Sequence, residues 1–216
     1  MTNFPVKSST RRAVAAGLAL LAAPGAVLAA ARPRVVTMLG DSITAGYGLQ
    51  GKDALPVQLQ AQLKALGVSA IVRGAGVSGD TSGGGAGRVD FSVQADTTLC
   101  VVALGGNDML QGLSPAAMQA NLTRIVRRLK ARRIGVLLVG LTAPASINAR
   151  YARDFNAVFP AVARAEGVPL YANLLAGVQG EPRLNQPDRL HPNPAGARII
   201  AQRLAPAVAR ALKSRP

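Results

Sequence analysis

The 216-residue chain is poor in several residue types that often carry protein chemistry. It has one cysteine, one histidine and no tryptophan, and its aromatic content is 3%. The single cysteine, Cys100, excludes an internal disulfide, and its place in the apolar run LCVVAL favours a buried core residue over a nucleophile. One histidine and one cysteine cannot supply the three or four ligands of a zinc site. We therefore expect no metal, and no motif in the chain implies an organic cofactor.

Acidic residues are also scarce, because ten Asp and Glu stand against 25 Lys and Arg, giving a net charge of +15. Nucleic-acid binding is one explanation of such a charge. The few aromatics and the lack of a recurring basic motif argue against it. We interpret the charge as a basic surface able to attract anionic lipid or acyl carriers, with at most peripheral membrane contact. The apolar fraction of 49% is ample for the core of one ordinary domain.

The first residues have the pattern of an export signal. Three basic residues within the first twelve positions precede an uncharged, mostly alanine run over residues 13–31. This run holds a Pro-Gly break and ends in small residues suited to cleavage. The paired arginines before it are also typical of twin-arginine signals, and an uncleaved anchor is the alternative. We expect residues 1–31 to be removed, residues 32–216 to form the functional domain, and the protein to be periplasmic or secreted.

Beyond the leader, short apolar runs alternate with longer segments of helical spacing. The runs are rich in Val, Ile and Leu, as strands covered on both faces are. Strands are predicted over residues 34–39, 69–73, 99–104, 135–140 and 168–171. Helices are predicted over residues 55–66, 115–133, 150–166 and 194–212, with Ser114 and Asn193 as N-caps of the second and the last. This alternation predicts a three-layer α/β/α sandwich around a central, mostly parallel, five-stranded sheet.

Polar and flexible residues follow the expected strands. Ser42 follows the first strand in GDSIT, Gly79 the second in SGDTS, and Asn107 the third in GGND. The fifth strand leads to DRLH, which contains Asp188 and His191. Ligands of open α/β sheets bind outside the carboxyl ends of the strands. We therefore expect these five residues to lie together at one edge of the sheet.

The chemistry that fits these residue types is acyl transfer to a serine. A serine hydroxyl is a weak nucleophile until a base takes its proton, and His191 is the only imidazole in the chain. Asp188 is placed to hold the second ring nitrogen. The backbone N–H groups of Ser42 and Gly79 and the amide of Asn107 can stabilise the oxyanion, each donor contributing about 3–4 kcal/mol. Taken singly, each residue has an ordinary structural explanation. Taken jointly at neighbouring strand ends, they favour catalysis.

Four blocks, GDSITAGYG, SGDTS, GGNDMLQG and DRLHPN, resemble in order and spacing those of the SGNH (GDSL-type) hydrolases. The resemblance runs from about Arg34 to the C-terminus. It implies a flavodoxin-like sandwich and an esterase of the arylesterase, lysophospholipase or acyl-thioesterase type. Such an enzyme acts through an acyl-enzyme on small acyl esters or thioesters, including lipid-derived ones. It also implies that Ser42, Asp188 and His191 form the triad and that Ser42, Gly79 and Asn107 form the oxyanion hole.

Two departures from these blocks bear on specificity. The stretch SGGGAGRVD stands where a firm helix is usual, and its three glycines are expected to weaken that helix. Arg189 follows Asp188 where a small residue such as glycine is common. Our hypothesis places Arg189 near the mouth of the site, where it favours anionic leaving groups. Asp41 and Asp108 are interpreted as hydrogen-bond acceptors that stabilise their loops.

Other interpretations of the same residues remain. Gly74-x-Gly76-x-x-Gly79 matches a dinucleotide fingerprint but runs into polar residues and further glycines. The segment that ends at Lys52 nearly matches a P-loop but lacks the Ser or Thr that should follow the lysine. The nucleophile-elbow motif G-x-S-x-G is also incomplete, because Thr44 stands in place of its second glycine. A carbohydrate O-acetylesterase is the alternative enzyme, although sugar sites usually use stacking aromatics. An exported binding module without catalysis is the alternative outside enzymes.

Overall fold

A parallel sheet of five strands forms the centre of the fold in the computed structural model, which describes residues 1–3 and 34–214. The strands are β1 (Arg34–Gly40), β2 (Ala70–Gly76), β3 (Leu99–Ala103), β4 (Gly135–Val139) and β5 (Leu170–Tyr171). Their order is β2-β1-β3-β4-β5, and every neighbouring pair is parallel. This confirms the predicted sandwich, and the sheet has no antiparallel strand among the described residues. The expected leader lies outside these residues except for its first three positions.

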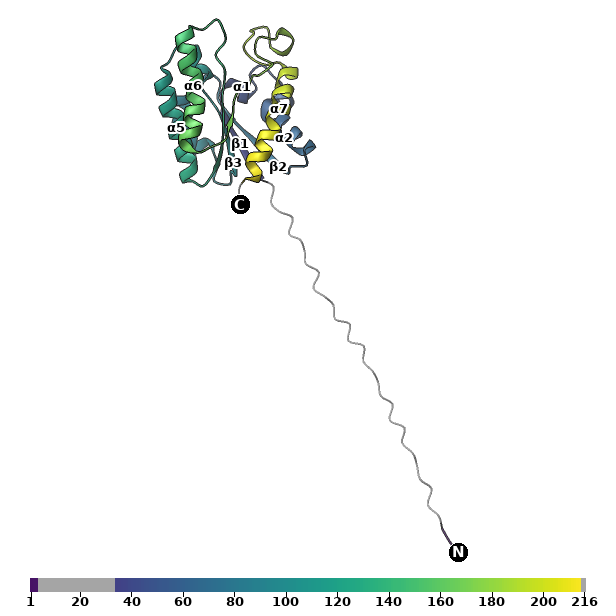
Figure 1. Cartoon of the computed structure of the whole chain (residues 1–216). Helices are drawn as coiled ribbons and strands as arrows, with labels where there is room; N and C mark the ends of the chain where they lie inside the picture. The colour runs from purple at the N-terminus through teal and green to yellow at the C-terminus, as the bar shows by residue number, and fades with distance from the viewer. Residues whose placement is uncertain (4–33, 215–216) are drawn as a thin grey trace. The chain divides into compact units, whose positions relative to one another are not determined.

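Helices cover both faces of the sheet. Within residues 34–214 they are α1 (Ser42–Ala45), α2 (Leu55–Ala65), α3 (Ser82–Ser92), α4 (Gly106–Leu110), α5 (Pro115–Ala131), α6 (Ala149–Glu166) and α7 (Pro194–Lys213), with 3₁₀ turns at Gly51–Asp53 and Pro182–Leu184. Figure 1 shows α2 and α7 on one side of the strands and α5 and α6 on the other. The four long helices agree with the predicted ones to within two residues at each end. None of the helices in this part of the chain has the length and apolar character that crossing a membrane requires.

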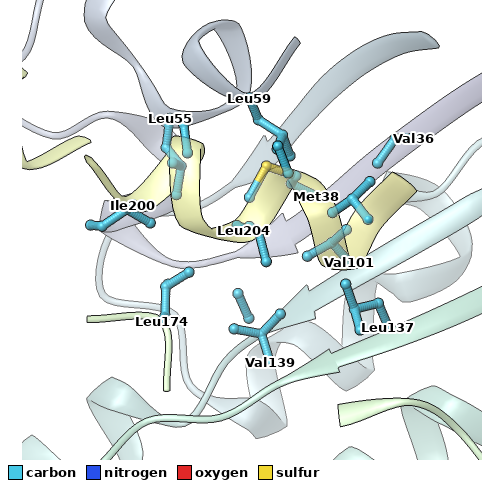
Figure 2. Packing of buried hydrophobic residues seen from close by; sticks show 14 of the residues in the cluster. Val36, Met38, Leu55, Leu59, Val101, Leu137, Val139, Leu174, Ile200 and Leu204 are labelled. Carbon is cyan, nitrogen blue, oxygen red and sulfur yellow. The ribbon is translucent and has the colours of Figure 1, made fainter. Parts of the chain in front are cut away.

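Each face of the sheet has its own apolar core, because successive residues of a strand point to opposite faces. Val101 of β3 belongs to the core beneath α2 and α7, whereas its neighbours Cys100 and Val102 belong to the core beneath α3, α5 and α6. Figure 2 shows Val101 and Val139 of the sheet facing Leu204 of α7. Cys100 is fully buried, and burial raises the pKa of its thiol to about 12, which confirms its interpretation as a core residue.

Helix α3 forms over Ser82–Ser92 in spite of its glycines, whose intrinsic helix propensity is low. Thr81 caps it by accepting a hydrogen bond from Gly84 N at 3.2 Å. Gly85 lies against the side chain of Leu104, and a Cβ at this position would come within 2.2 Å of Leu104 Cδ1. Because Gly85 has no side chain, Leu104 can pack directly against the helix, and this packing outweighs the propensity cost of about 1 kcal/mol per glycine.

The two expected N-caps have different outcomes. Asn193 Oδ1 accepts a hydrogen bond from Gly196 N at 3.0 Å, which confirms the cap of α7. Ser114 occupies the cap position of α5 but makes no capping hydrogen bond with its side chain. The prediction for Ser114 was therefore correct in position and wrong in mechanism. Pro115, at the first helical position, is pre-set for the helix by its ring, and its missing N–H is one that would have no partner within the helix.

The strand order shows at which point along the sheet a ligand-binding crevice is expected. The connection that follows β1 leads to β2 on one side, whereas the connection that follows β3 leads to β4 on the other side. In open α/β sheets a crevice forms outside the carboxyl ends of the strands where the order reverses. Ser42 directly follows this end of β1 and Asn107 follows this end of β3, so the fold brings two of the predicted site residues to the crevice.

Candidate active site

Ser42 is presented by a single helical turn at the end of β1. Asp41 caps this turn, and its Oδ1 accepts a hydrogen bond from Ile43 N at 3.1 Å. Gly46 ends the turn in the left-handed conformation with φ of 76°. Because Ser42 is the first residue of the turn, its backbone N–H has no acceptor within the helix. Both the hydroxyl and the N–H of Ser42 are therefore available at the crevice.

Ser42, His191 and Asp188 form a continuous chain of hydrogen bonds. Ser42 Oγ lies 2.9 Å from His191 Nε2, and His191 Nδ1 lies 2.7 Å from Asp188 Oδ2. With the imidazole proton on Nδ1, Asp188 accepts it and Nε2 is free to accept the serine proton. Ser42 and His191 are 149 positions apart in the sequence, and the fold alone brings them together. This geometry allows the imidazole to remove the serine proton while the carboxylate orients the ring.

The loop that carries Asp188 and His191 is held at both ends. Asn185 and Pro192 form an isolated antiparallel bridge, and Gln186 N donates to His191 O at 2.8 Å. The amide of Gln186 also donates to Tyr47 O at 2.7 Å, which ties this loop to the segment after α1. The Tyr47 ring lies against the His191 ring at a centroid distance of 4.6 Å. Histidine and serine are thus held together from two distant parts of the chain.

Asp188 is stabilised as an anion by its own loop. Its Oδ1 accepts hydrogen bonds from Leu190 N at 2.9 Å and His191 N at 3.0 Å, while Oδ2 accepts from the imidazole. The His191 backbone N–H, the His191 ring and the Leu190 N–H together lower the pKa of Asp188 to about 2. Asp188 therefore stays charged over the pH range in which an imidazole exchanges protons.

Gly79 and Asn107, the other two residues of the predicted oxyanion hole, each have an N–H directed to no other residue that the structure describes. The N–H of Asp80 donates to Val77 O at 3.1 Å and closes a turn in which Gly79 has φ of 82°, a value that the third residue of a type II turn requires. No residue in the described part of the chain accepts the Gly79 N–H. Asn107 Nδ2 donates to Asp80 O at 2.9 Å and has a second N–H left. Gly79, Asn107 and Ser42 all line the same cavity.

Asp41 and Asp108 act as loop acceptors, as predicted. Asp108 is 2% exposed, and its carboxylate accepts from Ser82 Oγ at 2.5 Å and from Ser82 N at 2.7 Å. It thereby joins α4, which carries Asn107, to the start of α3. Asp41 is 5% exposed, and burial raises its pKa to about 6 against the opposing effect of its hydrogen bond from Ile43 N. A carboxyl group directly beside Ser42 thus prefers its neutral form more than a free aspartate does.

A cavity of about 550 Å³ opens above these residues. Its walls are mainly apolar and come from the ends of four strands and the loop of His191. The apolar lining includes Met109, Leu110, Leu141, Ile147, Leu175 and Leu190. Such a volume is sufficient for a small ligand with an acyl group. The hydroxyl of Ser42 therefore faces an apolar chamber that also contains the amide and N–H donors.

Sequence reasoning missed the side chains that hold the site together. Arg88 reaches from α3 to Asp80 and to the carbonyls of Gly40 and Ala75, and Tyr47 contacts His191. No spacing rule links such pairs, although Tyr47 lies within the recognised block GDSITAGYG.

The rival motifs do not gain support, because Gly74–Gly79 opens no helix and Lys52 lies in a 3₁₀ turn. In the described ranges no three His, Cys, Asp or Glu side chains cluster as metal ligands.

The fold and this geometry define an α/β protein with a serine-hydrolase arrangement at the carboxyl edge of its sheet. Residues 38–199 match the family model of the GDSL-like lipase/acylhydrolase family. The matched range spans β1 to α7 and includes all five predicted site residues. The chain therefore belongs to this family of hydrolases, as its resemblance to SGNH hydrolases predicted, and it is a carboxylic ester hydrolase by class.

Known relatives and solved structures agree with this assignment. The chain is 36% identical over 163 residues to the esterase TesA of Pseudomonas aeruginosa, covering 75% of this chain and 81% of that protein. It is 33% identical over 177 residues to the thioesterase 1/protease 1/lysophospholipase L1 of Escherichia coli strain K12, covering 82% and 84%. The structure of AlinE4, an SGNH-hydrolase family esterase, superposes with a TM-score of 0.70 at 39% identity over 83% of this chain and 97% of that one.

Proposed function

We propose that the protein is a serine esterase that hydrolyses carboxylic esters or thioesters of small acyl chains through a covalent acyl-enzyme. The observation that carries this proposal is the pair of distances, 2.9 Å from Ser42 Oγ to His191 Nε2 and 2.7 Å from His191 Nδ1 to Asp188 Oδ2. Family membership supports the reaction class, and relatives named esterase, arylesterase and thioesterase support both oxygen and sulfur esters as substrates.

In the acylation step, His191 Nε2 removes the proton of Ser42 as Oγ attacks the acyl carbon. Negative charge develops on the carbonyl oxygen, which accepts hydrogen bonds from the N–H groups of Ser42 and Gly79 and from the free amide N–H of Asn107. Asp188 stabilises the imidazolium and keeps its orientation. When the bond to the leaving group breaks, the imidazolium donates its proton to the departing oxygen or sulfur, and the acyl group stays on Ser42.

Deacylation reverses these roles with water as the nucleophile. His191 takes a proton from a water molecule in the cavity, and the resulting hydroxide attacks the acyl carbon. The same oxyanion donors stabilise the second tetrahedral intermediate. Its collapse returns the proton from His191 to Ser42 Oγ and releases the carboxylic acid. No step requires a metal or an organic cofactor.

The cavity favours an apolar acyl group. Leu110, Leu141 and Ile147 line it, whereas Tyr47 is the only aromatic side chain among its lining residues, and that ring lies against His191. A sugar bound by stacking would need a free aromatic face. We therefore place a lipid-type or aryl ester ahead of an acetylated carbohydrate as the substrate, with no nucleic-acid partner.

The test is hydrolysis of p-nitrophenyl esters from acetyl to palmitoyl by the domain of residues 32–216, its Ser42→Ala variant and a Ser146→Ala variant. Ser146 also lines the cavity but has no imidazole partner, which makes it a matched control. We expect Ser42→Ala to lose at least about 10³-fold in kcat and Ser146→Ala to stay close to the parent. Equal activity of the parent and Ser42→Ala would contradict the proposal and favour a binding module. Activity confined to acetyl esters would favour the acetylesterase.

We propose further that residues 1–31 export the protein to the periplasm or beyond and are then removed. The basic start, the alanine-rich run and the small residues before position 32 support this. The full chain is expressed in a Gram-negative host, the cell is fractionated, and the N-terminus of the product is sequenced. A mature N-terminus near residue 32 in the periplasm is expected, and an Arg11→Lys/Arg12→Lys variant tests the twin-arginine route. A full-length product in the cytoplasm would contradict export.

A further inference from the structure

Arg189 has a backbone conformation that disfavours side chains. Its φ is 59°, in the left-handed region that glycine adopts without penalty and residues with a Cβ do not. Among the described residues other than glycine, only Arg133 shares this feature, and Arg133 simply follows the end of α5. Arg189, in contrast, stands between the two members of the Asp188–His191 pair. A large charged side chain is thus kept beside the catalytic base where glycine would be easier to accommodate.

The loop fixes the place from which the Arg189 side chain starts. Arg189 N donates to Gln186 O at 2.9 Å, and the next residue, Leu190, donates its N–H to Asp188 Oδ1. Gln186 N in turn donates to His191 O at 2.8 Å. These bonds are the ones that also orient the imidazole, so the position of the Arg189 Cα is coupled to the position of the base. The side chain lines the same cavity as Ser42 and His191.

The guanidinium of Arg189 has no partner among the residues that the structure describes. Arg73, Arg88 and Arg128 each form an ion pair with an aspartate, but no hydrogen bond or ion pair within residues 34–214 engages the Arg189 side chain. Apart from the Tyr47 phenol, the ionisable side chains that line the cavity are Asp41, Arg189 and His191, so Arg189 supplies its only permanent positive charge among the described residues. Asp41 is buried and already accepts from Ile43 N.

We propose that Arg189 is a specificity-determining residue that binds an anionic group, such as phosphate, carried by the leaving alcohol or thiol. The inference rests on the proposed esterase function and adds the class of leaving group. His191 must donate its proton to the leaving atom, so the leaving group lies on the side of the cavity formed by the His191 loop, where Arg189 is two residues away. The acyl chain occupies the apolar wall of Leu110, Leu141 and Ile147.

The experiment compares butanoyl esters of 4-hydroxybenzenesulfonate and of the neutral 4-hydroxybenzenesulfonamide, with each rate divided by the rate of hydroxide-catalysed hydrolysis of the same ester. The ratio of kcat/KM for the anionic and the neutral ester is the readout. We expect a ratio of about 5 to 10 for the parent at low salt, as for a partly exposed charge pair with hydrogen bonding, and a ratio close to 1 at 0.5 M salt.

Variants at Arg189 isolate the charge. Arg189→Gly and Arg189→Ala should bring the ratio to about 1, and Arg189→Glu should bring it below 1; because the readout is a ratio of two esters, a change in overall rate that affects both esters equally does not enter it. Arg198→Ala is the matched control, because Arg198 is exposed on α7 outside the cavity and its loss changes net charge equally. Since glycine accepts φ of 59°, Arg189→Gly should be at least as stable to heat as the parent, which separates specificity from misfolding. A ratio that Arg189→Gly leaves unchanged overturns the proposal.

Two further comparisons locate the anion and its source. Butanoyl and hemisuccinoyl esters of one neutral phenol place the charge on the acyl side instead, and an Arg189 effect confined to this pair would overturn the leaving-group assignment. Butanoylglycerol with and without a 3-phosphate, and S-butanoylpantetheine with and without a 4′-phosphate, ask whether the anion comes from a lysolipid-like alcohol or from a carrier-like thiol. If no ester is hydrolysed, or if Ser42→Ala is equally active, the proposed function fails and the leaving-group role of Arg189 fails with it, whereas an unchanged ratio in an active Arg189→Gly variant overturns the role of Arg189 alone.

Discussion

Arg88 Nε donates to Asp80 Oδ2 at 2.7 Å, and this ion pair joins α3 to the turn that carries Gly79. The same guanidinium donates to Gly40 O at 2.8 Å and to Ala75 O at 2.9 Å. Asp80 O in turn accepts from Asn107 Nδ2. One partly buried arginine of α3 therefore links the residues that we assign to the nucleophile and to both other donors of the oxyanion hole.

Replacing Arg88 with methionine should lower kcat by about 10- to 100-fold while KM changes little, because misplaced oxyanion donors weaken binding of the transition state more than of the substrate. Lysine at this position should recover part of kcat. Steady-state kinetics on a p-nitrophenyl ester measures both parameters. Arg73→Met, which removes an exposed ion pair with Asp96, is the control and should leave kcat unchanged.

A double-mutant cycle separates positioning from general stability. If Arg88 acts through the oxyanion donors, Arg88→Met should cost much less in a variant that already carries Asn107→Ala. Fully additive losses in kcat would show that Arg88 and Asn107 act independently and would contradict the positioning role.

Ser82→Ala should destabilise the fold by about 1.5–3 kcal/mol, because it leaves the buried Asp108 carboxylate without the Ser82 hydroxyl that it contacts at 2.5 Å. Urea unfolding followed by circular dichroism measures the free energy of unfolding. Ser114→Ala provides the comparison, since Ser114 stands at a helix start without a capping hydrogen bond and should change stability by less than about 0.5 kcal/mol. Similar small effects for both serines would show that the Ser82–Asp108 contact contributes little.

The sequence predicted the sheet and the set of site residues for one physical reason. Strands buried on both faces are continuous apolar runs, and parallel strands bring the residues that follow them to one edge. Knowing where β1 and β3 end therefore sufficed to predict that Ser42 and Asn107 lie at one edge of the sheet, where both line the same cavity. The blocks that contain Gly79 and His191 then indicated the chemistry without knowledge of any contact.

Other features could not be predicted, because they depend on contacts between distant residues or on very short elements. Helices α1 and α4 have four and five residues, too few for a periodic pattern. Helix α3 forms against propensity because Gly85 fits against Leu104, which only the packed structure shows. Gln186 and Tyr47 are 139 residues apart, and nothing in either segment indicates their hydrogen bond.

Asp41 should make the protein less stable as the pH rises through about 6. Its pKa in the folded state is raised to about 6 from 3.8, mainly by burial, so the folded state holds the proton more tightly than the unfolded one. Its contribution to stability is then fully present below pH 3.8 and is lost between about pH 4 and 6, a change of up to about 3 kcal/mol. In Asp41→Asn, this part of the pH dependence should be missing.

The measurement is the free energy of unfolding of the parent and of Asp41→Asn at pH 4 and pH 8. Their difference, Asp41→Asn minus parent, should increase toward pH 8, because only the parent then has to bury a charge. Asp188 has the opposite shift, to about 2, so it stabilises the fold above pH 3.8 and its effect stays constant over this interval. A difference that is flat or decreases between pH 4 and pH 8 would show that Asp41 is not held near its neutral form.

Tyr47 should support His191 through its ring and not through its hydroxyl. The two rings are 4.6 Å apart with an interplanar angle of 37°, and no residue in the described part of the chain takes a hydrogen bond from the phenol. An aromatic contact of this kind contributes about 0.5–1.5 kcal/mol and is stronger for an imidazolium than for a neutral ring. Tyr47→Leu should therefore lower kcat/KM by about 3- to 10-fold in ester hydrolysis, whereas Tyr47→Phe should keep the parental value. Equal losses in both variants would instead assign the effect to the hydroxyl, and equal parental activity would show that the Gln186 tether alone is enough to hold the loop of the base.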